Sequence, residues 1–220
     1  PLRYLGCIVI LGICKLNALS NLKTELLDGK TVFQTANGTQ RMYMMPFDKD
    51  SVMWQFSYPI SEEEARTLSK NGSGALKNEV LKLTKNWHHP IPQILEATQP
   101  NEITGYPVYD RALLSSDLLE NAGPVTILGD AAHPMSPFKG QGANQALLDA
   151  LHLAQKITSV YNDRKDVDLR KDVLEPFEKE MMDRSSVKVK KSAEAAKFLH
   201  TDIVLQEGNI TFGGKWSSSL

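Results

Sequence analysis

The sequence has almost no net charge and no hydrophobic run long enough to cross a membrane. Its 220 residues carry a formal net charge of −1 at pH 7, which gives no bulk electrostatic reason to expect binding to nucleic acid or to an anionic membrane. The most apolar run, LGCIVILGIC at residues 5–14, is too short to span a bilayer as a helix. We interpret this run as a buried strand, and the alternative is the hydrophobic part of a signal peptide.

Cysteine is also scarce. The two cysteines, Cys7 and Cys14, would point to opposite faces of a shared strand, where they cannot form a disulfide. We therefore expect free thiols in a reducing compartment, and hence a cytoplasmic protein. The sequence has no spacing of ligands typical of a zinc site, and we assign no metal.

Several motifs of nucleotide-binding and nucleophilic enzymes are missing. There is no P-loop, and Gly140-Gln141-Gly142 departs from the dinucleotide fingerprint because Gln145 stands where its last glycine belongs. Neither a G-x-S-x-G sequence nor a credible catalytic triad is present. We therefore assign no catalytic side chain.

What the sequence does contain is a patterned stretch from Gly123 to Ile157. Residues 125–128 are apolar and β-branched, which predicts a buried strand. A loop rich in glycine and proline follows over residues 129–142. Apolar residues then recur with the period of one helix face, which predicts a helix with a buried side, at positions 143, 146, 147, 150, 151, 154 and 157. Asp130 would lie at the carboxyl end of the strand, where open α/β sheets bind ligands.

This stretch resembles the second flavin-contacting motif of the FAD-dependent aromatic-ring hydroxylases, the single-component flavoprotein monooxygenases. The similar residues are Gly129-Asp130-Ala131-Ala132-His133-Pro134, then Pro137, then Gly140-Gln141-Gly142-Ala143-Asn144. The resemblance implies FAD as the cofactor, NAD(P)H and O2 as co-substrates, and hydroxylation of a small aromatic or polycyclic substrate. The cofactor supplies the chemistry of such enzymes.

The resemblance also implies which residues bind the cofactor: Gly129, Asp130, Pro137, Gly140, Gln141, Gly142, Ala143 and Asn144. The Asp130 carboxylate would accept hydrogen bonds from the ribityl hydroxyls, and the alternative is an N-cap of the following turn. The helix start near Ala143 would offer free N–H groups and a partial positive charge. We interpret His133 as hydrogen-bonded within the protein rather than as a general base.

The remaining sequence predicts a sheet followed by helices. Residues 4–58 indicate an antiparallel meander with a hairpin at Asn37-Gly38. Val52, Trp54, Phe56 and Tyr58 share one face of the last strand. Met42, Met44, Met53 and Gln55 are expected on the other face, or in the reverse arrangement, where they could line a pocket. For any single methionine we favour an ordinary core residue. Ser61 and Glu64 form a capping box, which predicts the start of a helix, and a second helix is expected over 74–87. Residues 103–109 predict a further strand, which we place at the edge of the sheet because it contains Pro107. A charged linker over 161–171 precedes a long helix that begins near Leu174.

We therefore expect an α+β or α/β fold, with a partial Rossmann-like FAD-binding domain, an antiparallel or mixed substrate-domain sheet and a long C-terminal helix. The expected domains are a substrate-binding sheet over 1–110, the carboxyl-terminal part of the FAD-binding domain over 111–205, and a disordered tail over 206–220. The Asp110-Arg111 pair is either a local ion pair or turn cap, or part of the active site.

The resemblance covers residues 2–200 and corresponds to the carboxyl-terminal half of such an enzyme. The Gly-rich strand–helix unit that binds the ADP half of FAD is not found, and the sequence begins with Pro1. We therefore expect a fragment that is inactive by itself. The alternatives are a non-enzymatic fragment or pseudoenzyme, or a related flavin reductase.

Overall fold

The computed structural model describes residues 1–19, 22, 24–114, 118–119, 122–163 and 166–206. The chain forms two compact units. Unit 1 contains Pro1–Leu5 and Tyr109–Ala196, and unit 2 contains Gly6–Val108 and, among the described residues, 197–206. Within the described residues, no helix has both the length and the apolar character needed to cross a membrane. The predicted domain boundaries stay a prediction, and residues 207–220 of the expected tail lie outside the described residues.

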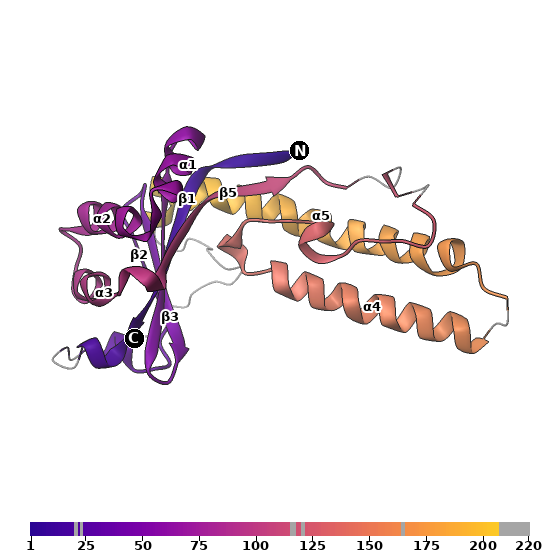
Figure 1. Cartoon of the computed structure of the whole chain (residues 1–220), viewed down its shortest axis with the longest axis horizontal. Helices are drawn as coiled ribbons and strands as arrows, with labels where there is room; N and C mark the ends of the chain where they lie inside the picture. Colours follow the sequence, from indigo (N-terminus) through magenta and orange to yellow (C-terminus); the bar gives the residue numbers. More distant parts are fainter. Residues whose placement is uncertain (20–21, 23, 115–117, 120–121, 164–165, 207–220) are drawn as a thin grey trace. The chain divides into compact units, whose positions relative to one another are not determined.

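The sheet has five strands in the order β2-β3-β4-β1-β5 (Figure 1). The strands are β1 (Leu2–Lys15), β2 (Phe33–Ala36), β3 (Arg41–Asp48), β4 (Ser51–Pro59) and β5 (Ile103–Arg111). The pairs β1–β4, β3–β4 and β2–β3 are antiparallel. The predicted antiparallel sheet is confirmed, but the meander is correct only for β2, β3 and β4, because β1 pairs with β4 and not with β2. Strand β5, which contains Pro107, lies at the edge of the sheet as expected. With the helices described below, the fold class is α+β.

The core of unit 2 lies on one face of this sheet. Alternation along β4 buries the side chains of Trp54 and Phe56 completely. Met42 pairs with Phe56 and Met44 with Trp54, and directly paired residues share a face. The expectation that Met42 and Met44 share a face with Met53 and Gln55 is therefore wrong. The interpretation of these methionines as core residues is confirmed, since both are fully buried. Their face is set by the strand register, which sequence alternation alone does not reveal.

Three helices pack against this face: α1 (Glu62–Lys70), α2 (Gly72–Thr84) and α3 (Ile91–Ala97). The indole of Trp54 donates its Nε1–H to Oγ1 of Thr98 (2.9 Å), and the rings of Phe56 and Trp87 meet edge to face. Both hydrogen bonds of the predicted capping box of α1 are present: the Ser61 side chain accepts from the Glu64 N–H, and the Glu64 side chain accepts from the Ser61 N–H. Helix α2 ends at Thr84, earlier than predicted, and Trp87 therefore belongs to the following connection.

The turn between β2 and β3 is confirmed but differs in detail. Only Gly38 has a left-handed backbone (φ 94°). The Asn37 side chain instead accepts hydrogen bonds from the backbone N–H groups of Thr39 (3.1 Å) and Gln40 (2.7 Å). Asn37 thus stabilises the turn through an Asx motif, without the positive φ that a two-residue type I′ turn requires.

Both cysteines are free and buried, and their strand partners, Pro59 for Cys7 and Val52 for Cys14, place them on opposite faces. Burial raises the pKa of the Cys7 thiol to about 12. Because the thiolate is the reactive form, we expect iodoacetamide at pH 8 to leave Cys7 unmodified in the folded chain. Mass spectrometry checks this, with guanidinium-unfolded chain as the control in which both thiols react. Equal labelling of Cys7 in the folded and unfolded chain would contradict the prediction.

Unit 1 is built on two long helices, α4 (Gly142–Asp163) and α5 (Glu175–Phe198), that lie side by side. The predicted long C-terminal helix is confirmed as α5. The predicted linker over 161–171 is shorter than expected, because α4 continues to Asp163 and a π-helical turn forms over Leu169–Leu174. This turn is capped by the Asp168 carboxylate, which accepts the N–H groups of Arg170 and Lys171.

The predicted buried strand at 125–128 is wrong. Residues Val125 and Leu128 are 58% and 37% exposed, and no strand pairs with this run within the described part of the chain. Leu128 does have an extended backbone (φ −145°, ψ 172°), as apolar and β-branched sequence favours. A β-strand, however, also needs a neighbouring strand that supplies hydrogen bonds.

The predicted burial of the apolar side of α4 is also wrong. Leu147, Leu151 and Ile157 are 69%, 51% and 38% exposed. Helix α4 turns polar residues toward α5 instead: Asp149 pairs with Arg184 (2.6 Å) and Lys156 with Glu180 (3.5 Å). Periodicity identified the apolar side of the helix correctly, but the side that faces α5 carries these charged residues together with Leu153, which packs against a buried cluster that includes Phe177.

Candidate functional site

The motif loop of residues 129–142 begins with a turn that only glycine fits well. Gly129 has a left-handed backbone (φ 59°), and an added Cβ would lie 3.3 Å from the Cβ of Ala146 on α4. The Gly129 N–H donates to Oδ2 of Asp149 (2.9 Å). Gly129 therefore fixes the start of the loop against α4, and its N–H is already used within the protein.

A buried charged network holds the loop between the two helices. The side chain of Asp149 is completely buried; its Oδ2 lies 2.7 Å from Nε2 of His133 and its Oδ1 accepts a hydrogen bond from Arg184 (2.6 Å). Arg184 also donates to Oε1 of Gln145 (2.7 Å). One carboxylate thus joins the loop, α4 and α5. The interpretation of His133 as hydrogen-bonded within the protein is confirmed.

The electrostatics of this network favour an ionised Asp149. Burial acts to raise the pKa of Asp149, but hydrogen bonds from Arg184, the Gly129 N–H and His133 outweigh it, so that the pKa is lowered. Sequence reasoning missed Asp149 and Arg184. The sequence did offer a signal for Asp149, because it is the only acid in the otherwise apolar run 146–151. Burying a carboxylate costs much free energy unless it is paired, so such an acid indicates a buried partner.

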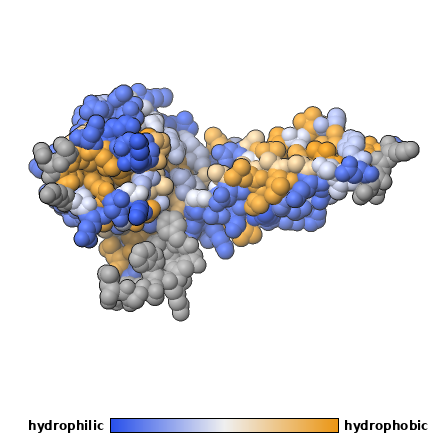
Figure 2. Space-filling view, turned by 90° about the horizontal axis from the view of Figure 1, so that it is seen from below, coloured by the Kyte–Doolittle hydropathy of each residue, from blue (hydrophilic) through white to orange (hydrophobic). Residues whose placement is uncertain are grey.

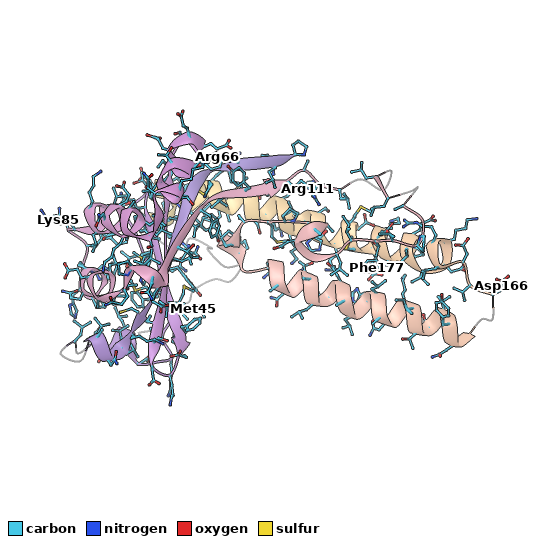
Figure 3. All side chains as sticks on the ribbon, viewed as in Figure 1. Met45, Arg66, Lys85, Arg111, Asp166 and Phe177 are labelled. Carbon is cyan, nitrogen blue, oxygen red and sulfur yellow. The ribbon has the colours of Figure 1, made fainter. Side chains whose placement is uncertain are left out.

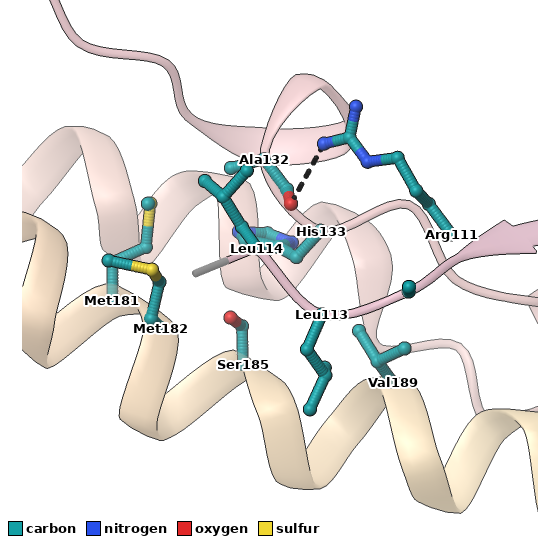
Figure 4. A pocket seen from close by; sticks show the side chains of 10 residues that line it. Arg111, Leu113, Leu114, Ala132, His133, Met181, Met182, Ser185 and Val189 are labelled. Carbon is teal, nitrogen blue, oxygen red and sulfur yellow. Dashed lines mark hydrogen bonds between the residues drawn. The ribbon is translucent and has the colours of Figure 1, made fainter. Parts of the chain in front are cut away.

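Arg111, the last residue of β5 (Figure 3), also contacts the loop. Its guanidinium donates to the backbone carbonyls of Ala131 and Ala132; the second contact, 3.1 Å long, is drawn in Figure 4. The neighbouring Asp110 is completely buried and pairs with Arg3 through two hydrogen bonds (2.7 and 2.8 Å). Asp110 therefore pairs with Arg3, which is distant in the sequence, and does not form the local ion pair with Arg111 that the sequence left open as one alternative. Arg111 stabilises the backbone of the motif instead.

A pocket lies behind the loop, between it and α5 (Figure 4). Its free volume is about 10 Å³, room for about one water molecule. None of the eight predicted cofactor residues lines it; its lining residues are Arg111, Ala112, Leu113, Leu114, Ala132, His133, Met181, Met182, Ser185 and Val189. This pocket is therefore part of the interior of unit 1 and too small for a cofactor.

The outer side of the loop is open. Asp130 is exposed and forms no hydrogen bond or ion pair with the described residues. Gly140 adopts a left-handed backbone (φ 59°) that closes the turn after Pro137, and an added Cβ would meet nothing within 4 Å. The loop thus presents a free carboxylate next to accessible backbone.

The amino end of α4 lies beside this carboxylate. A Cβ added at Gly142 would lie 3.9 Å from Oδ1 of Asp130. The Gln145 N–H donates to the Gln141 carbonyl (3.0 Å), so the N–H groups of residues 142–144 precede the first hydrogen bond of the helix. Hydrogen-bond acceptor and donor groups therefore stand together on an open glycine-containing surface, which suits a ligand that carries hydroxyls and a planar ring with carbonyl groups.

The chain matches the family described as FAD binding domain over residues 31–185. It belongs to this family. The matched residues include the whole motif loop and the start of α4 as far as Asn144. They also include Asp149 and Arg184. The resemblance to the FAD-dependent hydroxylases is thereby confirmed.

The curated relatives and solved structures agree with this assignment. The chain is 40% identical over 79 residues to an aurachin C monooxygenase/isomerase of Stigmatella aurantiaca, covering 36% of this chain and 20% of that protein. It is 34% identical over 146 residues to a phenazine 1,6-dicarboxylic acid hydroxylase, PhzS, of Lysobacter antibioticus, covering 60% and 34%. Klebsiella pneumoniae HpxO complexed with FAD and uric acid has a similar fold (TM-score 0.71, 20% identity), covering 91% of this chain and 47% of that one.

The match is therefore partial in length. The chain spans at most about a third of these curated relatives and about half of the HpxO chain. At 20% identity the likeness to HpxO shows the fold alone. That the eight named residues of this chain bind the cofactor remains a prediction.

Proposed function

We propose that this chain forms the flavin-ring and ribityl side of the site of an FAD-dependent monooxygenase that hydroxylates a small aromatic or polycyclic substrate with NAD(P)H and O2. The observation that carries the proposal is the free carboxylate of Asp130 beside the amino end of α4, within a chain that belongs to the FAD-binding domain family. Relatives named as monooxygenases and hydroxylases support the reaction class.

In this proposal each part of the loop has a separate task. Asp130 accepts hydrogen bonds from the ribityl hydroxyls, and the N–H groups of residues 142–144 donate to the polar edge of the ring. Pro137, Gly140 and Gln141 shape the backbone that approaches the ring, and Gly129 anchors the loop to Asp149. When bound, FAD supplies the redox and oxygen chemistry. The residues of this chain bind and orient the cofactor and exclude water from it.

The reaction is tested by oxygen uptake. We propose measuring O2 consumption with NADPH or NADH and aromatic substrates, using a full-length flavoprotein that contains this chain and is loaded with FAD. Substrate-dependent uptake supports a monooxygenase. A flavin reductase would oxidise NAD(P)H without substrate-dependent uptake, and a non-enzymatic chain would do neither. By itself the chain is expected to remain colourless or weakly flavinated on purification, because part of the cofactor's contacts lies outside it.

Replacing Asp130 with alanine should weaken flavin binding and leave the fold intact. Loss of a charge-assisted hydrogen bond costs about 1.5–3 kcal/mol, which corresponds to a roughly 10- to 150-fold rise in Kd. Riboflavin is the suitable probe, since it carries the ring and the ribityl chain, and quenching of its fluorescence reports binding. The matched control is Asp183→Ala, which removes another exposed carboxylate of unit 1. An unchanged Kd in Asp130→Ala would remove Asp130 from the ribityl role.

A further inference from the structure

The pocket behind the motif loop has mostly apolar walls but contains two buried polar side chains. His133 is 5% exposed and Ser185 is 3% exposed, and both line the pocket. In Figure 4 the hydroxyl of Ser185 points from α5 toward the imidazole of His133. Figure 2 shows hydrophobic side chains gathered on the outer surface of the part that contains α4 and α5, but none of the described residues of α4 lines the pocket. The two polar groups therefore lie inside unit 1, apart from that outer surface.

Hydrogen bonding fixes which nitrogen of His133 carries the proton. Nε2 lies 2.7 Å from Oδ2 of Asp149, and an ionised carboxylate can only accept, so Nε2 is the donor. In a neutral imidazole the other nitrogen, Nδ1, is then an acceptor. Nδ1 is buried and has no hydrogen-bond partner among the described residues, which includes Ser185. A buried acceptor of this kind costs free energy unless a donor reaches it.

The position and size of the pocket decide which donor can reach Nδ1. Nε2 is directed at α4, which does not line the pocket, so the other side of the ring faces it. The free volume of about 10 Å³ is about the minimum for one water molecule. Cavities that stay dry are lined by apolar groups, whereas a buried water molecule is held by two or more polar groups. His133 and Ser185 together meet this requirement.

We propose that the pocket binds one water molecule between Nδ1 of His133 and Oγ of Ser185. The water donates one hydrogen bond to Nδ1 and forms a second with the Ser185 hydroxyl, which can donate or accept. It thereby links the motif loop to α5 at a second point, besides the network in which Asp149 joins His133 to Arg184. Ser185 is a positioning residue for the loop, and this role does not depend on flavin binding.

A crystal structure and nuclear magnetic resonance of the complete 220-residue chain test this site. The crystal structure should show one water molecule within about 3.2 Å of both Nδ1 and Oγ. The ¹⁵N resonances of His133 report which nitrogen carries the proton and whether Nδ1 accepts a hydrogen bond, and ¹⁷O relaxation dispersion measures the residence time of buried water. The test variant is Ser185→Ala. The matched control is Ser186→Ala, which removes a neighbouring hydroxyl that donates to the Asp183 carbonyl (3.0 Å) and does not line the pocket.

We expect one long-lived water molecule in the wild type and in Ser186→Ala. In Ser185→Ala its residence time should fall roughly tenfold or more, the equivalent of one lost hydrogen bond, and the Nδ1 resonance should move toward that of a nitrogen that accepts no hydrogen bond. A dry pocket, or a Ser185 hydroxyl bonded directly to Nδ1, would overturn the proposal. So would a proton on Nδ1, or a residence time that is the same in Ser185→Ala as in the wild type.

Discussion

Replacement of Asp149 by alanine is expected to lower the free energy of unfolding by about 3–5 kcal/mol, the cost of breaking a buried ion pair by removing one partner. The carboxylate is completely buried and is the shared acceptor for Arg184, His133 and the Gly129 N–H. Without it, the N–H of Gly129 loses its acceptor, and the largely buried guanidinium of Arg184 loses its carboxylate partner and keeps only the hydrogen bond to Gln145. Urea unfolding followed by far-UV circular dichroism measures the loss, and hydrogen exchange of the Gly129 amide locates it in the loop.

The pH dependence gives a second measurement on the same group. The pKa of Asp149 is lowered in the folded chain, so its contribution to stability is complete above the unfolded value of about 3.9 and is lost as the pH falls through the folded value. We therefore expect stability to decline below about pH 4, and a smaller decline in Asp149→Asn.

A matched control separates this effect from the loss of any acid on these helices. Asp183 is an exposed partner of Lys179 on α5, and Asp183→Ala should cost less than about 1 kcal/mol, as exposed ion pairs do. If the Gly129 amide exchanges at the same rate in Asp149→Ala and in the wild type, the network does not hold the loop.

Replacement of Trp54 by alanine is expected to cost about 3–5 kcal/mol, the range for a large buried aromatic side chain. Trp54 is fully buried and is fixed by its hydrogen bond to Thr98. Thr98 keeps a second hydrogen bond, to the carbonyl of Ile94 (2.7 Å), so the cost comes mainly from the cavity. Urea unfolding followed by far-UV circular dichroism measures it.

A double-mutant cycle with Gly12 makes this prediction sharper. Gly12 is the strand partner of Trp54, and a Cβ added there would lie 2.6 Å from the indole ring. Gly12→Ala should therefore cost about 1–3 kcal/mol in the wild type through overpacking. In Trp54→Ala the clash is gone and the added methyl fills part of the cavity, so the same substitution should be neutral or stabilising.

The control for backbone effects is Gly74→Ala in helix α2, where an added Cβ meets nothing within 4 Å. This substitution should stabilise by up to about 1 kcal/mol through helix propensity, with or without Trp54. If Gly12→Ala lowered the free energy of unfolding by the same amount in the wild type and in Trp54→Ala, the missing side chain at Gly12 would not be what makes room for the indole ring.

Local signals in the sequence were sufficient for much of the fold. The capping box at Ser61, the alternation around Trp54, the turn at Gly38 and the length of α5 each depend on residues close together in the chain, and the structure contains them all. The two errors with the largest consequences, at residues 125–128 and on the apolar side of α4, both concern what covers an element. A hydrophobic pattern indicates which side of an element is apolar, but it does not identify the element that packs against that side.

The sequence by itself determined the family, the loop with its glycines, and the positions of most strands and helices, because motif spacing and side-chain periodicity are local properties. Only the tertiary structure decided that Asp149 contacts Gly129, His133 and Arg184 and that Arg111 donates to the loop carbonyls. It also decided that Asp130 is exposed and has no partner in the part of the chain that the structure describes. Those relations depend on which sides of the loop, α4 and α5 meet, and hence on hydrogen bonds, ion pairs and packing between residues far apart in the chain.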